Sequence, residues 1–369
     1  MKSRVVFFIL LIAVSVVLLA RFHVAIVRFF DPDEFAHLHW AWLMAQGKLP
    51  YRDFFFYATP LFQWFLFPLF KLPPSDLVLL LARLWEFALY LINVCYIFRI
   101  TQLVTKSYIV PALSILIFVT FPMTFDKTID IRPDFLMLLP YLIAIERLLA
   151  WPVLTIKRVL TVGLFFGSSF LIFFKIIYAL PAAILLLGFK RHSLTVYPEF
   201  AEGQESVLQD VAKTLIIFSL GFLLPIGLFL VYLFTNNLQA LAWNTFTHTQ
   251  FVVNTGKQTF SLFATLSPWP LVYVSKGGIS IPWLVNMGVW ISAIGGIVIL
   301  WKQHKPFALF SACFAFPAVL FLVFFPAPYV QYFIPLSAIA SILSAISIQN
   351  LEYRMQNIER KFRFIIPHS

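Results

Sequence analysis

Residues 31–60 read DPDEFAHLHWAWLMAQGKLPYRDFFFYATP, and they follow the first long apolar run of the chain. Asp31, Pro32 and Glu34 have the spacing of a capped helix start, with the aspartate as N-cap and the glutamate closing a capping box. A short helix is therefore predicted, and Gly47 ends it. Polar groups beside lipid cost free energy, so we expect the residues that carry the function of the protein to lie in this segment.

The composition is that of a membrane protein. Of its residues 61% are hydrophobic and 12% are charged, against roughly 25% charged in soluble domains, and the mean hydropathy is +0.89. Apolar runs of about 20 residues, each long enough to cross a ~30 Å hydrocarbon core, recur from end to end. The sequence predicts one all-α, polytopic transmembrane domain over residues 1–369, without a separate soluble domain.

Hydropathy predicts about ten transmembrane helices, near residues 5–27, 77–99, 108–124, 134–151, 158–174, 176–190, 213–234, 281–301, 306–325 and 332–349. The net charge of +11 comes from basic residues in alternate loops, as the positive-inside rule describes, and does not indicate nucleic-acid binding. This pattern predicts that both termini lie in the cytoplasm. The first run lacks a small-x-small cleavage site and is expected to stay as a helix.

Three longer segments separate these helices. Residues 28–76 are predicted to face outward and to hold two interfacial helices, of which the second covers 60–71. The first has an expected apolar face of Phe35, Leu38, Trp42 and Leu43. Residues 191–212 are polar and acidic and predict a cytoplasmic linker, and residues 235–280 predict an outward loop, long enough to act as a lid or binding loop.

Asp33 and Glu34 are the catalytic candidates of the first outward segment. Asp31 and Glu34 can both cap the helix, whereas Asp33 has no such structural role. The helix dipole favours an anion at this position, and a general base must be ionised and within reach of its proton. Asp33 is therefore favoured over Glu34 as the base. The alternative for each outward charge is a solvated surface ion pair.

Neighbouring residues suggest a supporting site. His37 lies one helical turn from Asp33. One interpretation is a divalent metal site formed by Asp33, His37 and Asp53. The alternative is that His37 only holds Asp33 in place. No metal ligand and no cofactor is assigned on this basis. Arg52 and Asp130 complete the set of supporting residues.

Three further residues are candidates for binding a phosphate. Arg132 is always charged and suits a bidentate phosphate grip. Lys175 lies between two apolar runs and suits a lipid phosphate, with a snorkelling lysine as the alternative. Tyr329, in the last outward turn, belongs to an aromatic belt or contacts a phosphate or sugar. Arg83 and Glu86, three residues apart, predict a structural ion pair inside the second span.

The order of these motifs resembles the GT-C superfamily of integral-membrane glycosyltransferases, in its protein-mannosyltransferase and aminoarabinose-transferase-like branch. The matching residues are Asp33, Glu34, Gly47, Pro50, Tyr51, Arg52, Asp53, Pro60 and Leu61, followed by Arg132-Pro133-Asp134, Lys175, and Tyr329, Tyr332 and Pro335. The likeness extends over most of the chain and is most specific in its first part. This chain has Thr59-Pro60 where a Pro-Pro pair is common, and it lacks the extra spans or soluble domain of larger members.

The resemblance implies an enzyme that takes a sugar from a polyprenyl-phosphate donor by inverting transfer on the outer face of the membrane. It implies that Asp33 deprotonates the acceptor hydroxyl and that Arg132 and Lys175 bind the donor phosphate. Because the additions of larger members often handle the acceptor, we expect a glycan or lipid acceptor here. Few cysteines and short loops suit a prokaryotic plasma (inner) membrane, with the site on the periplasmic side.

Two other function classes are alternatives to the enzyme. A lipid-linked-sugar flippase or transporter requires polar residues along midplane helices, and paired broken helices. A noncatalytic membrane scaffold does not require an acid cluster at residues 31–53. The ionisable residues lie mainly in the outward loops, and this favours the glycosyltransferase.

Overall fold

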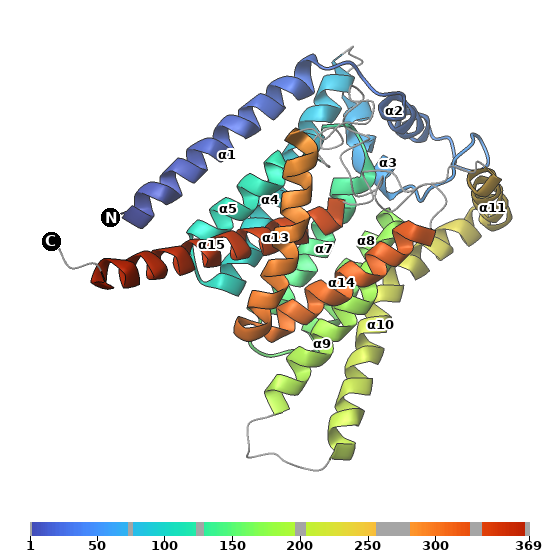
Figure 1. The fold of residues 1–369 in the computed structure, drawn as a ribbon. Helices are drawn as coiled ribbons and strands as arrows, with labels where there is room; N and C mark the ends of the chain where they lie inside the picture. The colour runs from blue at the N-terminus through green and yellow to red at the C-terminus, as the bar shows by residue number, and fades with distance from the viewer. Residues whose placement is uncertain are drawn as a thin grey trace.

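The computed structural model describes residues 2–72, 77–122, 129–195, 204–255, 281–324 and 334–365. Within these ranges every regular element longer than one isolated bridge is a helix, so the predicted all-α membrane fold is confirmed. The elements are α1 (Lys2–Val27), α2 (Pro32–Ala45), α3 (Leu61–Leu66), the 3₁₀ helix η1 (Phe67–Lys71), α4 (Val78–Thr105), α5 (Ile109–Thr120), α7 (Pro133–Ala150), α8 (Ile156–Ile172), the 3₁₀ helix η3 (Phe174–Ala179), α9 (Leu180–Thr195), α10 (Gln204–Thr235), α11 (Gln239–Thr255), α13 (Ile281–Gln303), α14 (Lys305–Phe324) and α15 (Ile334–Ile365) (Figure 1).

Each predicted apolar stretch is occupied by a helix. By length and composition, five of the helices in the described ranges are suited to crossing a membrane: Arg4–Val27, Val78–Thr105, Gln209–Thr235, Leu284–Gln303 and Ile334–Met355. Shorter apolar helices lie at Ile109–Thr120, Phe174–Phe189 and Lys305–Ala318. The chain is therefore a multi-helix membrane protein, and the number of ten spans stays a prediction.

Two of the three longer segments contain more helix than the sequence predicts. α9 runs to Thr195 and α10 begins at Gln204, so helix extends from both sides into the expected linker at 191–212. Asn237 adopts the left-handed conformation with φ 55°, and α11 begins two residues later inside the expected loop at 235–280. Threonine hydroxyls along α11 donate to carbonyls one turn back, so this polar segment still forms a regular helix. Residues 256–280 lie outside the described ranges.

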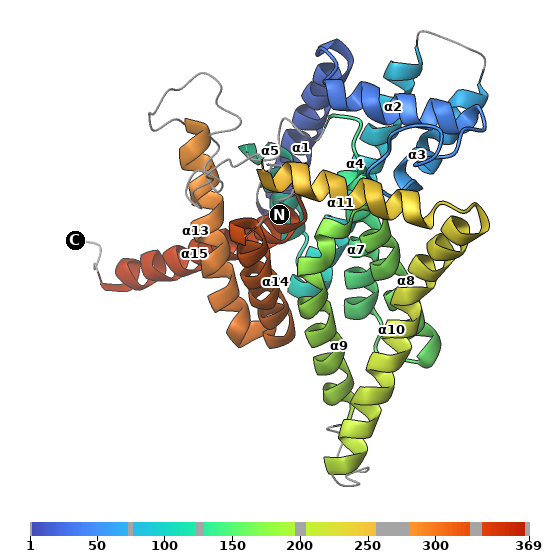
Figure 2. The ribbon, with the colours of Figure 1, turned by 90° about the vertical axis from the view of Figure 1, so that its right-hand side faces the viewer.

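The helices form an upright bundle with a layer of helices across one end. In Figure 2, α2 and α11 run across the top of the bundle, while α7, α8, α9 and α10 stand below them. The expected second interfacial helix consists of the short α3 and η1, which pack against α2 through Phe62, Leu66 and Leu69. The candidate residues of the first outward segment therefore lie at this end.

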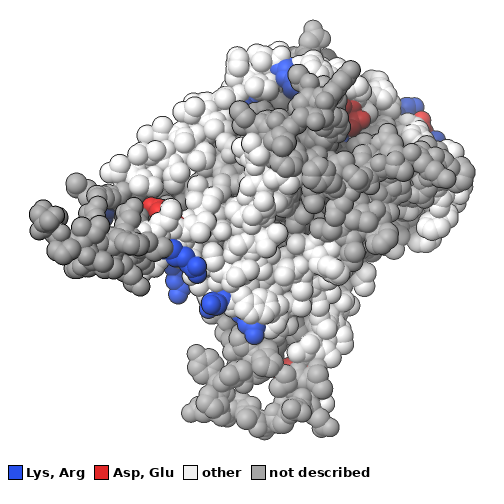
Figure 3. All heavy atoms as spheres, viewed as in Figure 1, with Lys and Arg blue, Asp and Glu red and all other residues white. Residues whose placement is uncertain are grey.

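The outer surface of the bundle is apolar, as expected of a protein surrounded by lipid. Large hydrophobic side chains stand exposed along α1, α10 and α13, among them Phe8, Ile12, Leu19, Leu220, Leu228, Ile291 and Ile294. Among the atoms coloured in Figure 3, the middle of the visible face has few charged side chains, and Lys and Arg gather along its lower left edge.

Helices α8 and α10 make a backbone-to-backbone contact through glycines. A Cβ atom added at Gly163 or Gly167 of α8 would lie 2.2 or 2.1 Å from a carbonyl oxygen of α10, and one added at Gly221 of α10 would lie 2.3 Å from a carbonyl of α8. Small residues four apart allow membrane helices to approach in this way. Only glycine fits at these positions without a shift of one helix against the other.

The variant Gly167→Ala tests this contact, with Gly227→Ala on α10 as the matched control. A Cβ at Gly227 meets nothing within 4 Å, and alanine is the better helix former by about 1 kcal/mol. Overpacking at Gly167 is expected to cost about 1–3 kcal/mol. Thermal unfolding of the purified protein in detergent should therefore show a lower midpoint for Gly167→Ala and an unchanged or higher one for Gly227→Ala. Equal midpoints for the two variants would contradict a tight glycine contact.

Candidate active site

A buried ion pair between α2 and α4 organises the end of the bundle where α2 lies. Arg83 donates from Nε to Oε1 of Glu34 at 2.8 Å and from Nη2 to Oε2 at 2.7 Å, and both side chains are at most 1% exposed. The carboxylate also accepts the backbone amides of Asp31, at 2.8 Å, and Ile131, at 3.1 Å. The first of these contacts completes the predicted capping box of α2.

The remaining donors of Arg83 bind the end of α1. Nη1 donates to the carbonyls of Ala25 and Arg28, both at 2.8 Å, and Nη2 donates to that of Phe29 at 2.9 Å. The guanidinium also lies 3.8 Å from the ring centroid of Phe30. A charge buried in a low-dielectric interior requires this degree of pairing. Arg83 therefore joins α1, α2, α4 and, through Glu34, the segment before α7.

This geometry gives Glu34 a structural task, since both carboxylate oxygens are occupied and the side chain is shielded from solvent. The ion pair predicted between Arg83 and Glu86 is wrong. Arg83 binds Glu34 across 49 residues of sequence, and within the described part of the chain neither carboxylate oxygen of Glu86 has a hydrogen-bond partner. The sequence signal for the true pair is the presence of two opposite charges in apolar surroundings, where each needs a partner.

Asp130 takes part in a second ion pair at the same end. Arg28, just after α1, donates to the buried carboxylate of Asp130 at 2.9 Å. With the amide of Ile131 bound to Glu34, the backbone at residues 130–131 is held against α1 and α2. This fixes the position of Arg132, the residue that follows.

Asp33 and Arg132 meet at the edge of the site. Arg132 Nη1 donates to Asp33 Oδ2, and its Nε lies 3.4 Å from Oδ2 of Asp134. The Asp33 side chain is 57% exposed, whereas that of Arg132 is 12% exposed and that of Asp134 is 1% exposed. Burial alone would lower the pKa of Arg132, but the carboxylates of Asp134 and Asp33 outweigh it and raise that pKa. Asp33 thus presents an accessible carboxylate with a permanent cation behind it.

Lys175 supplies a second basic group. It lies in η3, directly after α8, with 9% of its surface exposed and its Nζ 4.8 Å from the ring centroid of Phe173. Burial, together with the nearby charge of Arg132, lowers the pKa of Lys175 to about 7, and the nearby Asp134 acts against this shift. The structure therefore brings Asp33, Arg132 and Lys175, which are far apart in the sequence, into one cluster around Asp134.

His37 lies in the interior beside this cluster. Gln63 of α3 donates from Nε2 to Nδ1 of His37 at 3.1 Å, and the imidazole packs edge-on against Phe62 and Trp40 at 5.1 and 5.5 Å. Burial, assisted by the charge of Arg132, lowers the pKa of His37 to about 3. The ring is therefore neutral at physiological pH. Gln63 is a partner that the sequence analysis did not consider.

Arg52 and Asp53 stabilise a turn and do not join the cluster in the described contacts. Arg52 Nε donates to Asp53 at 3.0 Å, and Asp53 accepts the backbone amide of Leu49 at 2.8 Å. These two contacts lower the pKa of Asp53. Across the described ranges no group of three or more His, Cys, Asp and Glu side chains is placed to hold a metal ion. Asp33, His37 and Asp53 thus form no such group. Tyr329 lies outside the described residues.

The buried face of α2 differs from the predicted apolar face. Glu34, His37, Leu38, Ala41 and Met44 point inward, and Leu38 is the residue that both sets share. Phe35 and Trp42 are 50% and 43% exposed, with the Trp42 ring stacked on His39 at 5.6 Å. The ion pair explains the difference, because turning Glu34 toward Arg83 rotates Phe35 outward.

Comparison with known proteins identifies the fold. No family model matches the sequence, and no curated protein is significantly similar to it. The structure is similar to that of ArnT from Cupriavidus metallidurans bound to undecaprenyl phosphate, with a TM-score of 0.61 and 14% sequence identity. The similarity covers 92% of this chain and 60% of the ArnT chain, so this chain spans about three fifths of that structure. The chain therefore has a helical membrane fold similar to that of the ArnT structure.

The variant Glu34→Gln tests the structural role of the buried pair, with Asp33→Asn as the control on the same helix. Glu34→Gln leaves the Arg83 charge buried without its counter-ion, which is expected to cost about 3–5 kcal/mol. Asp33 is mostly exposed, so its variant should unfold near the wild-type temperature. Thermal unfolding in detergent measures both. Similar midpoints for the two variants would show that the pair is not an anchor.

The neutral state of His37 predicts a pH dependence of stability. The unfolded chain has a histidine pKa of about 6.5, so the stabilisation is complete above that pH and is lost as the pH falls toward the folded value of about 3. Between pH 6.5 and pH 5 the loss is roughly 2 kcal/mol. Unfolding temperatures at pH 7.5 and 5 should differ less for His37→Gln than for wild type. The exposed His39 is the control, and His39→Gln should keep the wild-type difference.

Proposed function

We propose that this protein is a glycosyltransferase that moves a sugar from a polyprenyl-phosphate donor to a glycan or lipid acceptor. The observation that carries the proposal is the placement of an accessible carboxylate, Asp33, near two largely buried basic groups, Arg132 and Lys175. Such a transfer has one proton to remove and one phosphate to hold, and this cluster has a group for each task. The similarity to a structure bound to undecaprenyl phosphate supports a donor of this class.

Asp33 is assigned the role of general base. It lies in the first turn of α2, where the helix dipole stabilises the carboxylate anion. Its exposure allows an acceptor hydroxyl to approach within hydrogen-bond distance. In the proposed step Asp33 takes the hydroxyl proton while the oxygen bonds to the anomeric carbon. The bond from that carbon to the donor phosphate breaks at the same time, and attack from the opposite side inverts the configuration.

Arg132 and Lys175 are assigned to the leaving lipid phosphate. As the sugar departs, negative charge grows on the phosphate oxygens, and fixed cations stabilise it most strongly where water is largely excluded. The planar guanidinium of Arg132 suits bidentate contact with phosphate. Asp134 beside Arg132, and the Arg28–Asp130 pair just before it, keep Arg132 in position, so this group needs little reorganisation on binding. No nucleotide takes part in this reaction.

The location that fits this chemistry is the prokaryotic plasma membrane, with the site on the periplasmic side. The basic loops predict that the opposite end of the bundle faces the cytoplasm, and sugars carried on polyprenyl phosphates are then used at the outer leaflet. A flippase or a scaffold would place no demand on the proton-accepting ability of Asp33, and this difference separates the three functions by experiment.

The variant Asp33→Asn, which keeps size and polarity but cannot act as a base, should abolish sugar transfer. We expect its cells and cells with the gene deleted to lack the same sugar increment from their envelope glycans or glycolipids, as measured by mass spectrometry. Loss of a general base costs typically 10²–10⁴-fold in rate. Asp210→Asn, an acid of α10 in the predicted cytoplasmic linker, should transfer the sugar at or near the wild-type rate.

Expression at wild-type level must accompany each comparison. A product lost on deletion but retained in Asp33→Asn would remove Asp33 as the base and favour the flippase or scaffold. The missing mass would also identify the sugar.

A further inference from the structure

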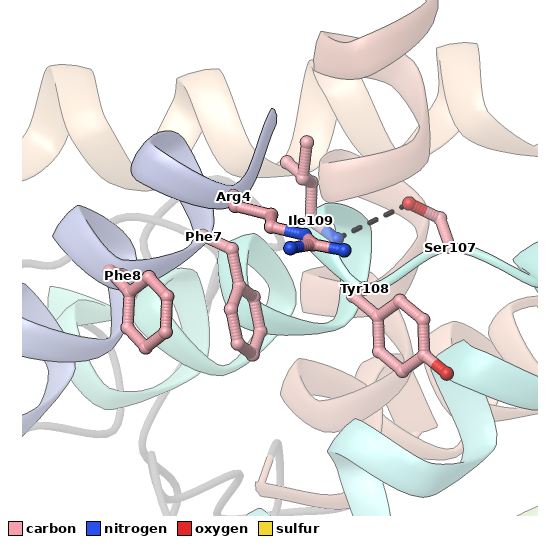
Figure 4. Close-up of a pocket in the computed structure, with 6 residues that line it drawn as sticks. All are labelled: Arg4, Phe7, Phe8, Ser107, Tyr108 and Ile109. Carbon is pink, nitrogen blue, oxygen red and sulfur yellow. Dashed lines mark hydrogen bonds between the residues drawn. The ribbon is translucent and has the colours of Figure 1, made fainter. Parts of the chain in front are cut away.

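A cavity lies at the end of α1 opposite α2 and the candidate active site. Its volume is about 590 Å³, within the range of about 300–1,000 Å³ typical of ligand pockets. Figure 4 shows its lining, which comes from the start of α1 and from the turn between α4 and α5: Arg4, Phe7, Phe8, Ser107, Tyr108 and Ile109. None of these residues takes part in the site around Asp33.

The polar side of the cavity is cationic. Arg4 is exposed, and within the described part of the chain it forms no hydrogen bond or ion pair. Beside it, the Ser107 hydroxyl accepts the backbone amide of Ile109 at 3.2 Å, and the exposed Lys106 precedes this serine. A guanidinium with its donors available suits a phosphate group. The cavity therefore presents positive charge without a counter-ion.

The other side of the cavity is aromatic. The ring centroids of Phe7 and Phe8 lie 5.9 Å apart, and those of Phe7 and Tyr108 lie 6.3 Å apart. Phe8 and Tyr108 are 60% and 64% exposed, and α1 continues from here as an apolar membrane helix. A soluble phosphate would use only the cationic side. A phospholipid would use both, because its headgroup meets Arg4 where its chains enter the hydrocarbon layer.

We propose that this cavity binds an anionic phospholipid of the membrane leaflet opposite the active site. The lipid phosphate contacts Arg4, and the upper part of an acyl chain lies against Phe7 and Phe8. Basic pockets between transmembrane helices recognise acidic lipid headgroups in this way. The bound lipid is distinct from the sugar donor, whose proposed phosphate site lies at the other end of the bundle. It joins α1 to the α4–α5 turn and so stabilises the fold.

The test titrates phosphatidylglycerol into the purified, delipidated protein in detergent and follows the unfolding temperature. We expect a saturable rise with phosphatidylglycerol and little with phosphatidylcholine, whose headgroup is neutral overall. Arg4→Gln should raise the half-saturating lipid concentration by roughly tenfold, the effect of one charged hydrogen bond. Lys157→Gln, at the start of α8 and outside the cavity lining, removes the same charge and should leave the titration unchanged.

A second variant tests the proposal independently, in case the Arg4→Gln protein does not fold. Ser107→Asp keeps an acceptor for the Ile109 amide but places a negative charge in the cavity, and it should weaken the response as Arg4→Gln does. An unchanged response in both variants would overturn the proposal. So would an equal loss in Lys157→Gln, which would indicate general surface charge. An equal rise with glycerol 3-phosphate would show a free phosphate ligand in place of a lipid.

Discussion

The ion pair between Arg83 and Glu34 is the constraint on which the α2 end of the protein depends. A guanidinium and a carboxylate removed from water need both each other and further hydrogen bonds. Here the end of α1, the start of α2 and the segment before α7 supply them. Segments that are separate in the sequence are thus joined at one buried point.

This buried anchor also determines where the reactive groups lie. Neighbouring residues of a helix point about 100° apart, so turning Glu34 inward leaves Asp33 at the surface. On the other side, the Ile131 amide bound to Glu34 holds the backbone that carries Arg132. Asp33 is the neighbour of Glu34, and Arg132 is the neighbour of Ile131. The contact between Asp33 and Arg132 is therefore a consequence of the buried contacts of Glu34.

Local features of the sequence were sufficient to predict much of the fold. The capping box of α2 and the apolar runs depend on residues close in sequence, and the structure contains them. The pairing of Arg83 with Glu34 depends on tertiary packing, so the nearer Glu86 was the wrong choice. α11 was missed because its composition is polar and hydropathy windows find only apolar helices. The inward turn of His37 followed from the ion pair and not from the apolar pattern of α2.

The glycine contact between α8 and α10 has a mechanical consequence. Where two backbones touch, no side chain can change rotamer to let one helix slide past the other. α8 and α10 are therefore expected to move together as one unit. Lys175 lies three residues beyond the end of α8 and moves with this pair. Its position is therefore set by two helices together, before any ligand reaches the cluster.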